Sequence, residues 1–431
     1  MDVLAETMAR LDGSHSAYHA ISLIENDLKN AGFAEIFEQN PFQLEKGKGY
    51  YLKRNGSTIF AFFVPTGEFK GFRIAASHSD SPSFKLKHNP VVLSAGYNEL
   101  RVEPYGGMIM STWFDRPLSV AGRVMVEKDG EIEERLFDID EDLAVIPNQC
   151  IHFSRDINDG HKFDPNTELI PLLGAMGEEF SWGSYLQRKA NLGEGETIVD
   201  EDLFLYVREK ARRVGLEGEF LLSPRLDNLT SAFTSTFALL QSSPKDGMPV
   251  MVVFDNEEVG SSSRQGAAGD LLKSTLDRIC ASLGKNKEES YANSFLLSID
   301  NAHARHPNYP GNFEPSCQVR LNEGVVLKYN ASLRYTSDGY SASVVRTLAK
   351  KANVSIQTFS NRPDIRGGST LGNIALSSLS IPAADIGLAQ LAMHSSVETM
   401  GAYDLLAMKE LVREFYSSSI LFMGDRVRIE D

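Results

Sequence analysis

The sequence predicts an α/β fold, in which a largely parallel sheet is flanked by helices and a β-rich domain is inserted into the chain. After residue 227, helical patterns alternate with short apolar strands, which is typical of βαβ units. Similar elements occur before residue 90, and short β-like segments replace them between the two regions. We therefore expect one α/β domain built from residues 1–90 and 224–431, and an inserted β-rich domain over residues 91–223.

The elements of the first region follow from periodicity and turn residues. Apolar residues recur at steps of four, three and four between Ala17 and Leu28, which predicts an amphipathic helix that ends near Gly32. Asn55-Gly56 is the commonest two-residue hairpin turn and indicates strands on both sides. These strands and the next apolar segment are expected at residues 50–54, 57–64 and 72–76.

The inserted region and the C-terminal region differ in their expected secondary structure. Segments such as 118–126 and 132–137, separated by Gly, Asp and Glu, predict a β-rich insertion. Beyond it, helices are expected at 229–241, 270–283, 341–351 and 371–378, with a last helix around 405–415. Buried strands are expected at 249–254, 294–299, 355–359 and 383–387.

Composition and charge restrict the class of protein. Of 431 residues, 42% are hydrophobic and 23% charged, which is ordinary globular usage and excludes a disordered chain. The formal charge of −15 argues against nucleic-acid or anionic-membrane binding. Three cysteines without a C-x-x-C pair make a disulfide framework improbable. Without a secretory signal or an apolar run of ~20 residues, the sequence predicts a soluble, cytoplasmic protein.

Acidic residues and histidines gather where the expected strands end. In an open α/β sheet the carboxyl ends of the strands share one crevice, so these side chains should meet. Unpaired carboxylates packed together repel one another, and divalent cations remove this repulsion. A mixed set of imidazoles and carboxylates suits zinc better than magnesium or calcium. The residues concerned are His78, Asp80, Asp227, Glu257, Glu258, Asp300 and His394.

Each of these residues also has an ordinary structural explanation. Short motifs match by chance, and polar residues at strand and helix ends often form caps and turns. However, the coincidence of all of them at strand ends favours a metal site. The alternatives are a hydrogen-bonded surface pair for His78 and Asp80, a solvated face for Glu257 and Glu258, a helix N-cap for Asp227, a turn for Asp300 and a core histidine for His394.

Five motifs together resemble the aspartyl aminopeptidases, which are dinuclear zinc exopeptidases. The motifs occur in the family's order and span nearly the whole chain, at residues 77–82, 225–229, 256–261, 300–304 with 306–308, and 390–395. Two positions depart from the family. A Cys-Gly-Ser-Thr form is common where this chain has Gly367-Gly368-Ser369-Thr370, and a histidine of some members is absent near Glu323.

The resemblance implies two divalent metal ions per subunit, with zinc first and manganese or cobalt as alternatives. Glu257 would be the general base for a metal-activated water. Asp80 would orient His78 and raise its basicity. One metal would be bound by His78, Asp227 and Asp300, and the other by Asp227, Glu258 and His394, so that Asp227 bridges them.

The resemblance also implies residues that contact the substrate. His152 matches a family histidine that acts as a ligand or stabilises substrate near a neighbouring subunit's site, although a surface histidine is the alternative. Lys328 matches a family lysine, and its alternative is an exposed strand lysine. The candidates for substrate binding are Lys328, His303 and Ser369, with Arg334 and Arg366 as further cations for an acidic side chain.

The resemblance implies a metallo-aminopeptidase that removes N-terminal residues, preferably Asp or Glu, from peptides. The resemblance implies a homo-oligomer in which dimers assemble into a dodecamer, with residues 91–223 serving as a dimerisation and lid domain. A metal-dependent amidohydrolase or deacylase acting on N-acyl substrates is a second hypothesis. A non-catalytic assembly protein is the third, and it would predict a damaged ligand set.

Overall fold

A nine-stranded sheet forms the centre of the computed structural model, which describes residues 1–177, 179–365 and 367–430. The strand order is β1-β2-β3-β13-β4-β14-β18-β16-β17. Five of its eight neighbouring pairs are parallel, which confirms the largely parallel sheet. The strands are β1 (Ala34–Glu35), β2 (Gly49–Arg54), β3 (Thr58–Phe63), β4 (Gly71–His78), β13 (Gly247–Phe254), β14 (Phe295–Ile299), β16 (Val325–Tyr329), β17 (Ile356–Ser360) and β18 (Ala383–Gly387).

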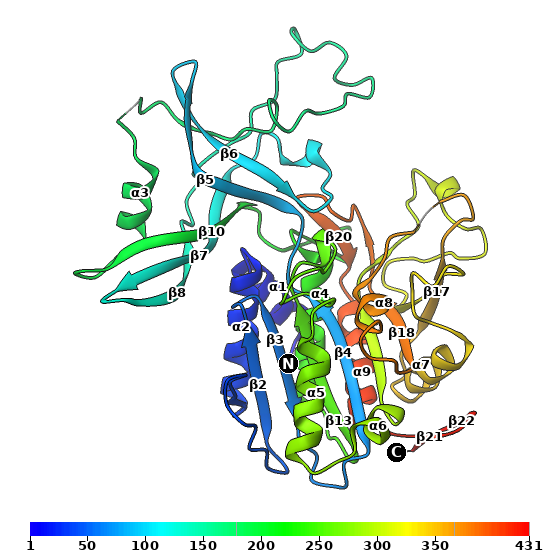
Figure 1. Cartoon of the computed structure of the whole chain (residues 1–431). Coiled ribbons are helices and arrows are strands. Elements are labelled where there is room, and N and C mark those ends of the chain that lie inside the picture. Colours follow the sequence, from blue (N-terminus) through cyan, green and yellow to red (C-terminus); the bar gives the residue numbers. More distant parts are fainter. Residues whose placement is uncertain (178, 366, 431) are drawn as a thin grey trace.

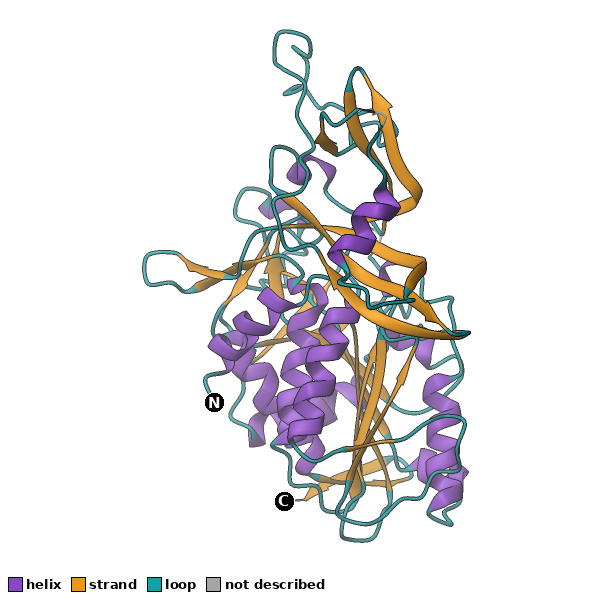
Figure 2. Cartoon of the chain, turned by 90° about the vertical axis from the view of Figure 1, so that its left-hand side faces the viewer, coloured by secondary structure: helices purple, strands orange, loops and turns teal. Residues whose placement is uncertain are grey.

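Helices cover both faces of this sheet (Figure 2). Strand residues alternate between the faces, so on β3 Ile59 and Ala61 pack into one core while Phe60 and Phe62 pack into the other. The first core is covered by α1 (Val3–Gly13), α2 (Ala17–Asn30), α4 (Leu226–Leu240), α7 (Gly339–Lys351) and α9 (Asp404–Ser417). The second is covered by α5 (Leu271–Ser282), α6 (Lys287–Ala292) and α8 (Leu371–Ala375).

A six-stranded antiparallel sheet follows β4 and sits at the carboxyl end of that strand (Figure 1). It has its own core, which includes Phe84, Trp113 and Leu205. Its expected domain boundaries, 91–223, stay a prediction. In sheet order the strands are β8 (Glu131–Asp138), β7 (Leu118–Lys128), β10 (Thr197–Val207), β5 (Ser83–Ser94), β6 (Tyr97–Tyr105) and β9 (Leu172–Gly174), with the helix α3 (Trp182–Lys189) beside them.

A third, five-stranded sheet joins segments that are distant in sequence. Its order is β11 (Arg212–Val214), β12 (Phe220–Ser223), β20 (Glu398–Gly401), β19 (Ala389–Leu391) and β15 (Ala302–His303). The chain ends in a hairpin, β21 (Ser419–Met423) and β22 (Arg426–Glu430). This hairpin and α1 are two elements beyond those expected from the sequence. In the described part of the chain, no helix combines the length and apolar character needed to cross a bilayer.

Candidate metal centre

The strand register brings the ends of three neighbouring strands to one level. Phe254 of β13 pairs with His78 of β4, and Ser298 of β14 pairs with Ala76 of β4. Counting two residues along both strands of the second pair places Asp300 level with His78. The two glutamates follow Phe254 in the short 3₁₀ helix η2 (Glu257–Val259). Carboxylates from both neighbouring strands therefore surround the His78 imidazole.

Two irregular segments supply the other ligand candidates. Asp227 lies in the first turn of α4, where its own backbone is extended (ψ 110°), so the turn is not a regular helix start. His394 lies in the loop between β19 and β20, with a positive φ of 67°. Both segments reach the carboxyl end of β4 because the five-stranded sheet ties the 389–401 hairpin to the strand that precedes α4.

Asp227 stands between two imidazoles. Nε2 of His78 lies 3.6 Å from Asp227 Oδ1 and 3.5 Å from Asp300 Oδ1. Nε2 of His394 lies 3.5 Å from Asp227 Oδ2 and 3.3 Å from Glu258 Oε1. The two carboxylate oxygens of Asp227 thus face different histidines, and each histidine has a second carboxylate beside it.

These donor atoms fit divalent cations. In tetrahedral zinc sites with bonds of ~2.0–2.2 Å, neighbouring ligand atoms lie about 3.3–3.5 Å apart. The four measured separations span 3.3–3.6 Å. In addition, Asp227 Oδ1 is buried without a hydrogen-bond donor, which is costly unless a cation satisfies it. The donor atoms of His78, Asp227 and Asp300, and those of Asp227, Glu258 and His394, each lie within 4.8 Å of one another.

The electrostatics of the site reflect crowded buried charges. Burial, followed by neighbouring carboxylates, raises the pKa of Glu257 to about 8, and burial raises that of Glu258 to about 7. Burial lowers the pKa of His394, but contacts with Asp227 and Glu258 outweigh it and raise this pKa to about 11. Carboxylates that resist ionisation beside imidazoles that retain protons are the expected signature of ligands gathered for a cation.

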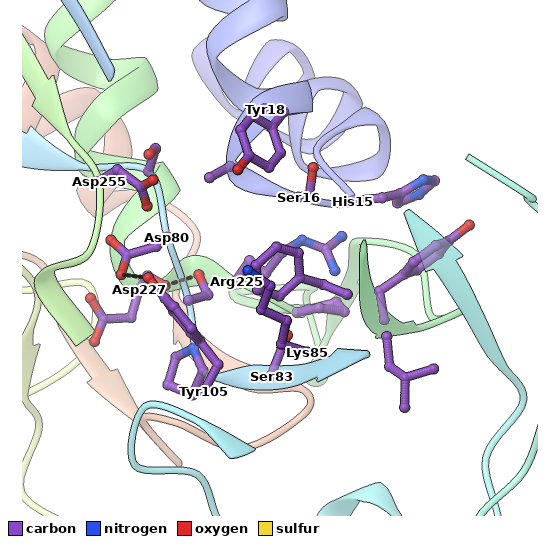
Figure 3. A pocket seen from close by; sticks show the side chains of 18 of the residues that line it. His15, Ser16, Tyr18, Asp80, Ser83, Lys85, Tyr105, Arg225, Asp227 and Asp255 are labelled. Carbon is purple, nitrogen blue, oxygen red and sulfur yellow. Dashed lines mark hydrogen bonds between the residues drawn. The ribbon is translucent and has the colours of Figure 1, made fainter. Parts of the chain in front are cut away.

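Asp80 touches the candidate centre at three points. One of its oxygens lies 3.3 Å from Nδ1 of His78, which leaves Nε2 of that ring directed at the ligand carboxylates. The backbone N–H groups of Glu257 and Glu258 both donate to the Asp80 carboxylate at 3.1 Å. The Tyr105 hydroxyl donates to it at 2.8 Å (Figure 3). Asp80 is therefore placed to fix both His78 and the glutamate segment.

The segment that follows β6 contacts His394 and orients its ring. Nδ1 of His394 lies 2.7 Å from the carbonyl oxygen of Gly107. A carbonyl can only accept, so Nδ1 carries the proton and Nε2 is free to bind a metal. The backbone N–H of Ile109 donates to the His394 carbonyl at 2.9 Å. Residues that follow the first hairpin of the six-stranded sheet therefore orient a ligand candidate of the main sheet.

Lys328 lies next to the centre. It is only 2% exposed, so its interpretation as an exposed strand lysine is wrong. Its Nζ donates to the Asn301 carbonyl at 3.1 Å and lies 3.9 Å from Asp300 Oδ2. Burial alone would raise the pKa of Asp300, but the charges of Lys328 and His78 lower it to about 2.

The remaining substrate candidates are more exposed. His303 in β15 is exposed, and its ring meets that of Phe359 edge-on at 6.1 Å. Ser369 is exposed and donates to Asn373 at 3.0 Å. His152 lies in an exposed turn. Arg334 is partly exposed, and Arg366 lies outside the described residues.

A cavity of about 230 Å³ borders the centre on the side of Asp80 (Figure 3). His15, Ser16 and Tyr18 at the start of α2 face Lys85 of β5 across it. Asp80 and Asp227 line one wall, whereas none of the three substrate-binding candidates does. The cavity therefore lies between the nine-stranded and six-stranded sheets, behind the ligand candidates.

Sequence reasoning missed three residues that position the centre, namely Tyr105, Gly107 and Glu398. Glu398 accepts hydrogen bonds from the backbone of both Asp227 and His394. Nothing marks Tyr105 or Gly107 in the sequence, because their partners are more than 20 residues away. The only available signal for Glu398 is an acidic residue at the start of a buried strand, four residues after His394.

Comparisons with known proteins agree with this geometry. Residues 11–416 match the family model described as aminopeptidase I zinc metalloprotease (M18). A probable M18 family aminopeptidase 2 of Clostridium acetobutylicum is 41% identical over 415 residues, covering 94% of this chain and 96% of that protein.

Solved structures share the fold. A chain in the cryo-EM structure of the Ape4 and Nbr1 complex is 36% identical, with a TM-score of 0.93 that covers 96% of this chain and 85% of that one. The S. cerevisiae mApe1 dodecamer is 25% identical, with a TM-score of 0.84 over 96% of each chain. The fold class and the family resemblance are confirmed. This chain belongs to the M18 family of zinc metallopeptidases and is an aminopeptidase.

Proposed function

We propose that this aminopeptidase removes acidic N-terminal residues from peptides at a centre that holds two divalent cations. The observation that carries the two-cation proposal is the position of Asp227, whose two oxygens face His78 and His394 separately. One cation is held by His78, Asp227 and Asp300, and the other by Asp227, Glu258 and His394. Imidazoles mixed with carboxylates favour zinc, with manganese or cobalt as alternatives.

Bound cations at these positions supply Lewis acidity, which polarises the scissile carbonyl and makes water acidic enough to be activated near neutral pH. The residues of the chain supply proton transfer and orientation. Asp80 holds the His78 ring and, through two backbone N–H groups, the segment that carries Glu257. The reaction therefore depends on a rigid ligand frame as well as on the ligands.

Glu257 is proposed as the general base. Its carboxylate lies within 4.8 Å of the donor atoms of His78 and Glu258, so it can reach a water bound at the centre. Glu257 would take a proton from the attacking water and deliver one to the leaving amine. Glu258 differs from it by lying 3.3 Å from Nε2 of His394, which suits a ligand better than a base.

The acidic preference is proposed from Lys328. Its buried ammonium lies beside Asp300, so a substrate carboxylate bound at the centre would meet a fixed positive charge. Phe359 pairs with Lys328 in the sheet and contacts His303, which places these two candidates in one neighbourhood. The role proposed for Ser369 rests on the family resemblance alone.

A homo-oligomer is proposed from the mApe1 dodecamer, to which the chain is similar, and from the apolar surface of the region 91–223. Ile132, Phe153 and Val199 are 63%, 81% and 52% exposed. Such side chains gain free energy when a neighbouring subunit removes them from water. We propose that this region pairs subunits and covers the site, with His152 reaching a neighbouring subunit. The free thiols of Cys150, Cys280 and Cys317 support a cytoplasmic location.

The experiment that tests the function compares kcat/KM for Asp-, Glu-, Leu- and Lys-anilides and for N-acetyl-Asp-anilide. We expect Asp and Glu to exceed Leu by at least about tenfold, since a hydrogen bond between charged groups contributes about 1.5–3 kcal/mol. The N-acetyl substrate should remain uncut. A clear preference for Leu would refute the acidic preference, and cleavage of the blocked substrate would favour the amidohydrolase alternative.

A further inference from the structure

Glu398 is a buried carboxylate that binds the backbone of two ligand candidates. It is 2% exposed and begins β20, directly after the loop that carries His394. One of its oxygens accepts the backbone N–H of Asp227 at 2.9 Å. The other accepts the backbone N–H of His394 at 2.7 Å. A single side chain thus joins the start of α4 to the β19–β20 loop.

The same carboxylate belongs to a buried hydrogen-bond network. Gln390 donates to Glu398 at 3.3 Å and accepts from the Asn301 amide at 2.9 Å. Asn301, which follows Asp300, also donates to the Leu226 carbonyl at 2.9 Å. The segments that carry Asp227, Asp300 and His394 are therefore tied together by buried hydrogen bonds.

The His394 loop needs such support. His394 and Ala392 both have positive φ angles, 67° and 54°, which non-glycine residues adopt only when the surroundings hold them there. A backbone N–H that is withdrawn from water without an acceptor is costly, so the Glu398 oxygen that accepts from His394 stabilises this loop. The bond from His394 to Glu398 compensates the strained backbone and fixes the position from which the imidazole projects.

We propose that Glu398 is a positioning residue for the metal site, holding Asp227 and His394 at the separation that lets both bind one cation. It acts through the backbone N–H groups of these two residues. This inference rests on the proposed ligand set. Asp80 accepts the backbone N–H groups of Glu257 and Glu258 in the same way. Two buried carboxylates therefore position the ligand candidates on the two sides of the centre.

The test uses the full-length protein with the isosteric substitution Glu398→Gln. Asp404→Asn is the matched control, because Asp404 is also 2% exposed and accepts two backbone N–H groups, from Asn322 at 2.7 Å and Gly324 at 2.8 Å. Metal-free proteins are titrated with Zn²⁺ against a competing chelator and with Co²⁺ while visible absorption is recorded. Circular dichroism checks folding.

Glu398→Gln should bind one of two Zn²⁺ ions about 10–100-fold more weakly than wild type and should change the Co²⁺ spectrum. Asp404→Asn should keep both properties. Wild-type affinity and spectrum in Glu398→Gln would overturn the inference, as would an equal loss in Asp404→Asn. If Glu398→Gln does not fold, Gln390→Met removes the donor to the same carboxylate, and an unchanged spectrum overturns the inference there. A wild-type protein that binds no metal would instead overturn the ligand set.

Discussion

The Tyr105 hydroxyl donates a 2.8 Å hydrogen bond to the Asp80 carboxylate. Tyr105 is the last residue of β6 in the six-stranded sheet, whereas Asp80 follows β4 of the main sheet. Asp80 also accepts the backbone N–H groups of Glu257 and Glu258. The hydrogen bond from Tyr105 therefore affects the position of Glu257, the proposed base, through Asp80. The six-stranded sheet therefore helps to build the centre of its own subunit.

Tyr105→Phe should lower kcat/KM by about tenfold or more, because a hydrogen bond to a charged group contributes about 1.5–3 kcal/mol. Metal content should stay at the wild-type level, since Tyr105 touches no ligand candidate directly. Tyr97→Phe on the same strand is the control, because Tyr97 is 50% exposed. Steady-state kinetics on the preferred anilide measure both variants. Equal activity of Tyr105→Phe and Tyr97→Phe would show that the contact is dispensable.

Glu257→Gln should retain metal and lose about 10²–10⁴-fold in kcat, which is the usual contribution of general acid–base catalysis. The amide keeps the shape of the side chain but cannot take a proton. Glu258→Gln provides the contrast, since loss of a ligand should reduce metal content as well. Full turnover of metal-loaded Glu257→Gln would remove this residue from the role of base.

Removal of metal should destabilise the protein. A cation present at about 1,000 times its Kd contributes about 4 kcal/mol per site to the free energy of unfolding. Chelation should therefore lower Tm and abolish activity, and Zn²⁺, Mn²⁺ or Co²⁺ should restore both. Thermal unfolding with and without chelator measures the change. In Asp227→Ala the chelator should have little effect on Tm. An unchanged Tm of the wild type in the presence of chelator would contradict a bound metal.

Lys328→Met should remove the acidic preference. The variant deletes the buried ammonium beside Asp300 while keeping similar side-chain length. The substitution also removes the positive charge that lowers the pKa of Asp300. The Asp- and Leu-anilides are therefore compared on the same variant protein at saturating metal, so that a change in Asp300 affects both substrates. The ratio of kcat/KM for the Asp- and Leu-anilides should fall by about tenfold or more. An unchanged ratio would place the source of selectivity elsewhere.

Acid stability should depend on His19, whose Nδ1 lies 2.8 Å from the Ser16 hydroxyl. Burial, the main cause, lowers the pKa of His19 to about 4. Since this folded pKa is below the unfolded value of about 6.5, stability is complete above pH 6.5 and falls as pH drops towards 4. Between pH 7 and 4.5, wild type should lose roughly 2 kcal/mol more than His19→Asn in urea unfolding. Parallel pH curves would refute this assignment.

Local patterns were sufficient for the α/β architecture and for the gathering of His78, Asp227, Glu258, Asp300 and His394. Strand ends that meet at one sheet edge explain this success for His78, Glu258 and Asp300. Asp227 and His394 reach that edge from α4 and from the β19–β20 loop, which the five-stranded sheet holds in place. Even the N-terminal helix α1 has a readable pattern, with Val3, Thr7 and Leu11 buried at four-residue steps. Leu4 and Met8 pack against the same core, so the sequence does carry the apolar face of α1.

The supporting residues could not be predicted in the same way. Glu398 and Tyr105 act through contacts with backbone and side chains that the tertiary fold alone brings near. The burial of Lys328 likewise depends on β16 lying between β17 and β18, which no local pattern of the lysine reveals. Sequence thus indicates ligand candidates, whose chemistry is conspicuous, more readily than the residues that hold those candidates in place.

Metal analysis of the purified protein after dialysis decides whether the gathered side chains form a two-cation centre. We expect two Zn²⁺, Mn²⁺ or Co²⁺ ions per chain in the wild type and loss of both in Asp227→Ala, because each oxygen of this carboxylate serves one site. One ion or none per wild-type chain, or two ions retained in Asp227→Ala, would contradict a centre bridged by Asp227.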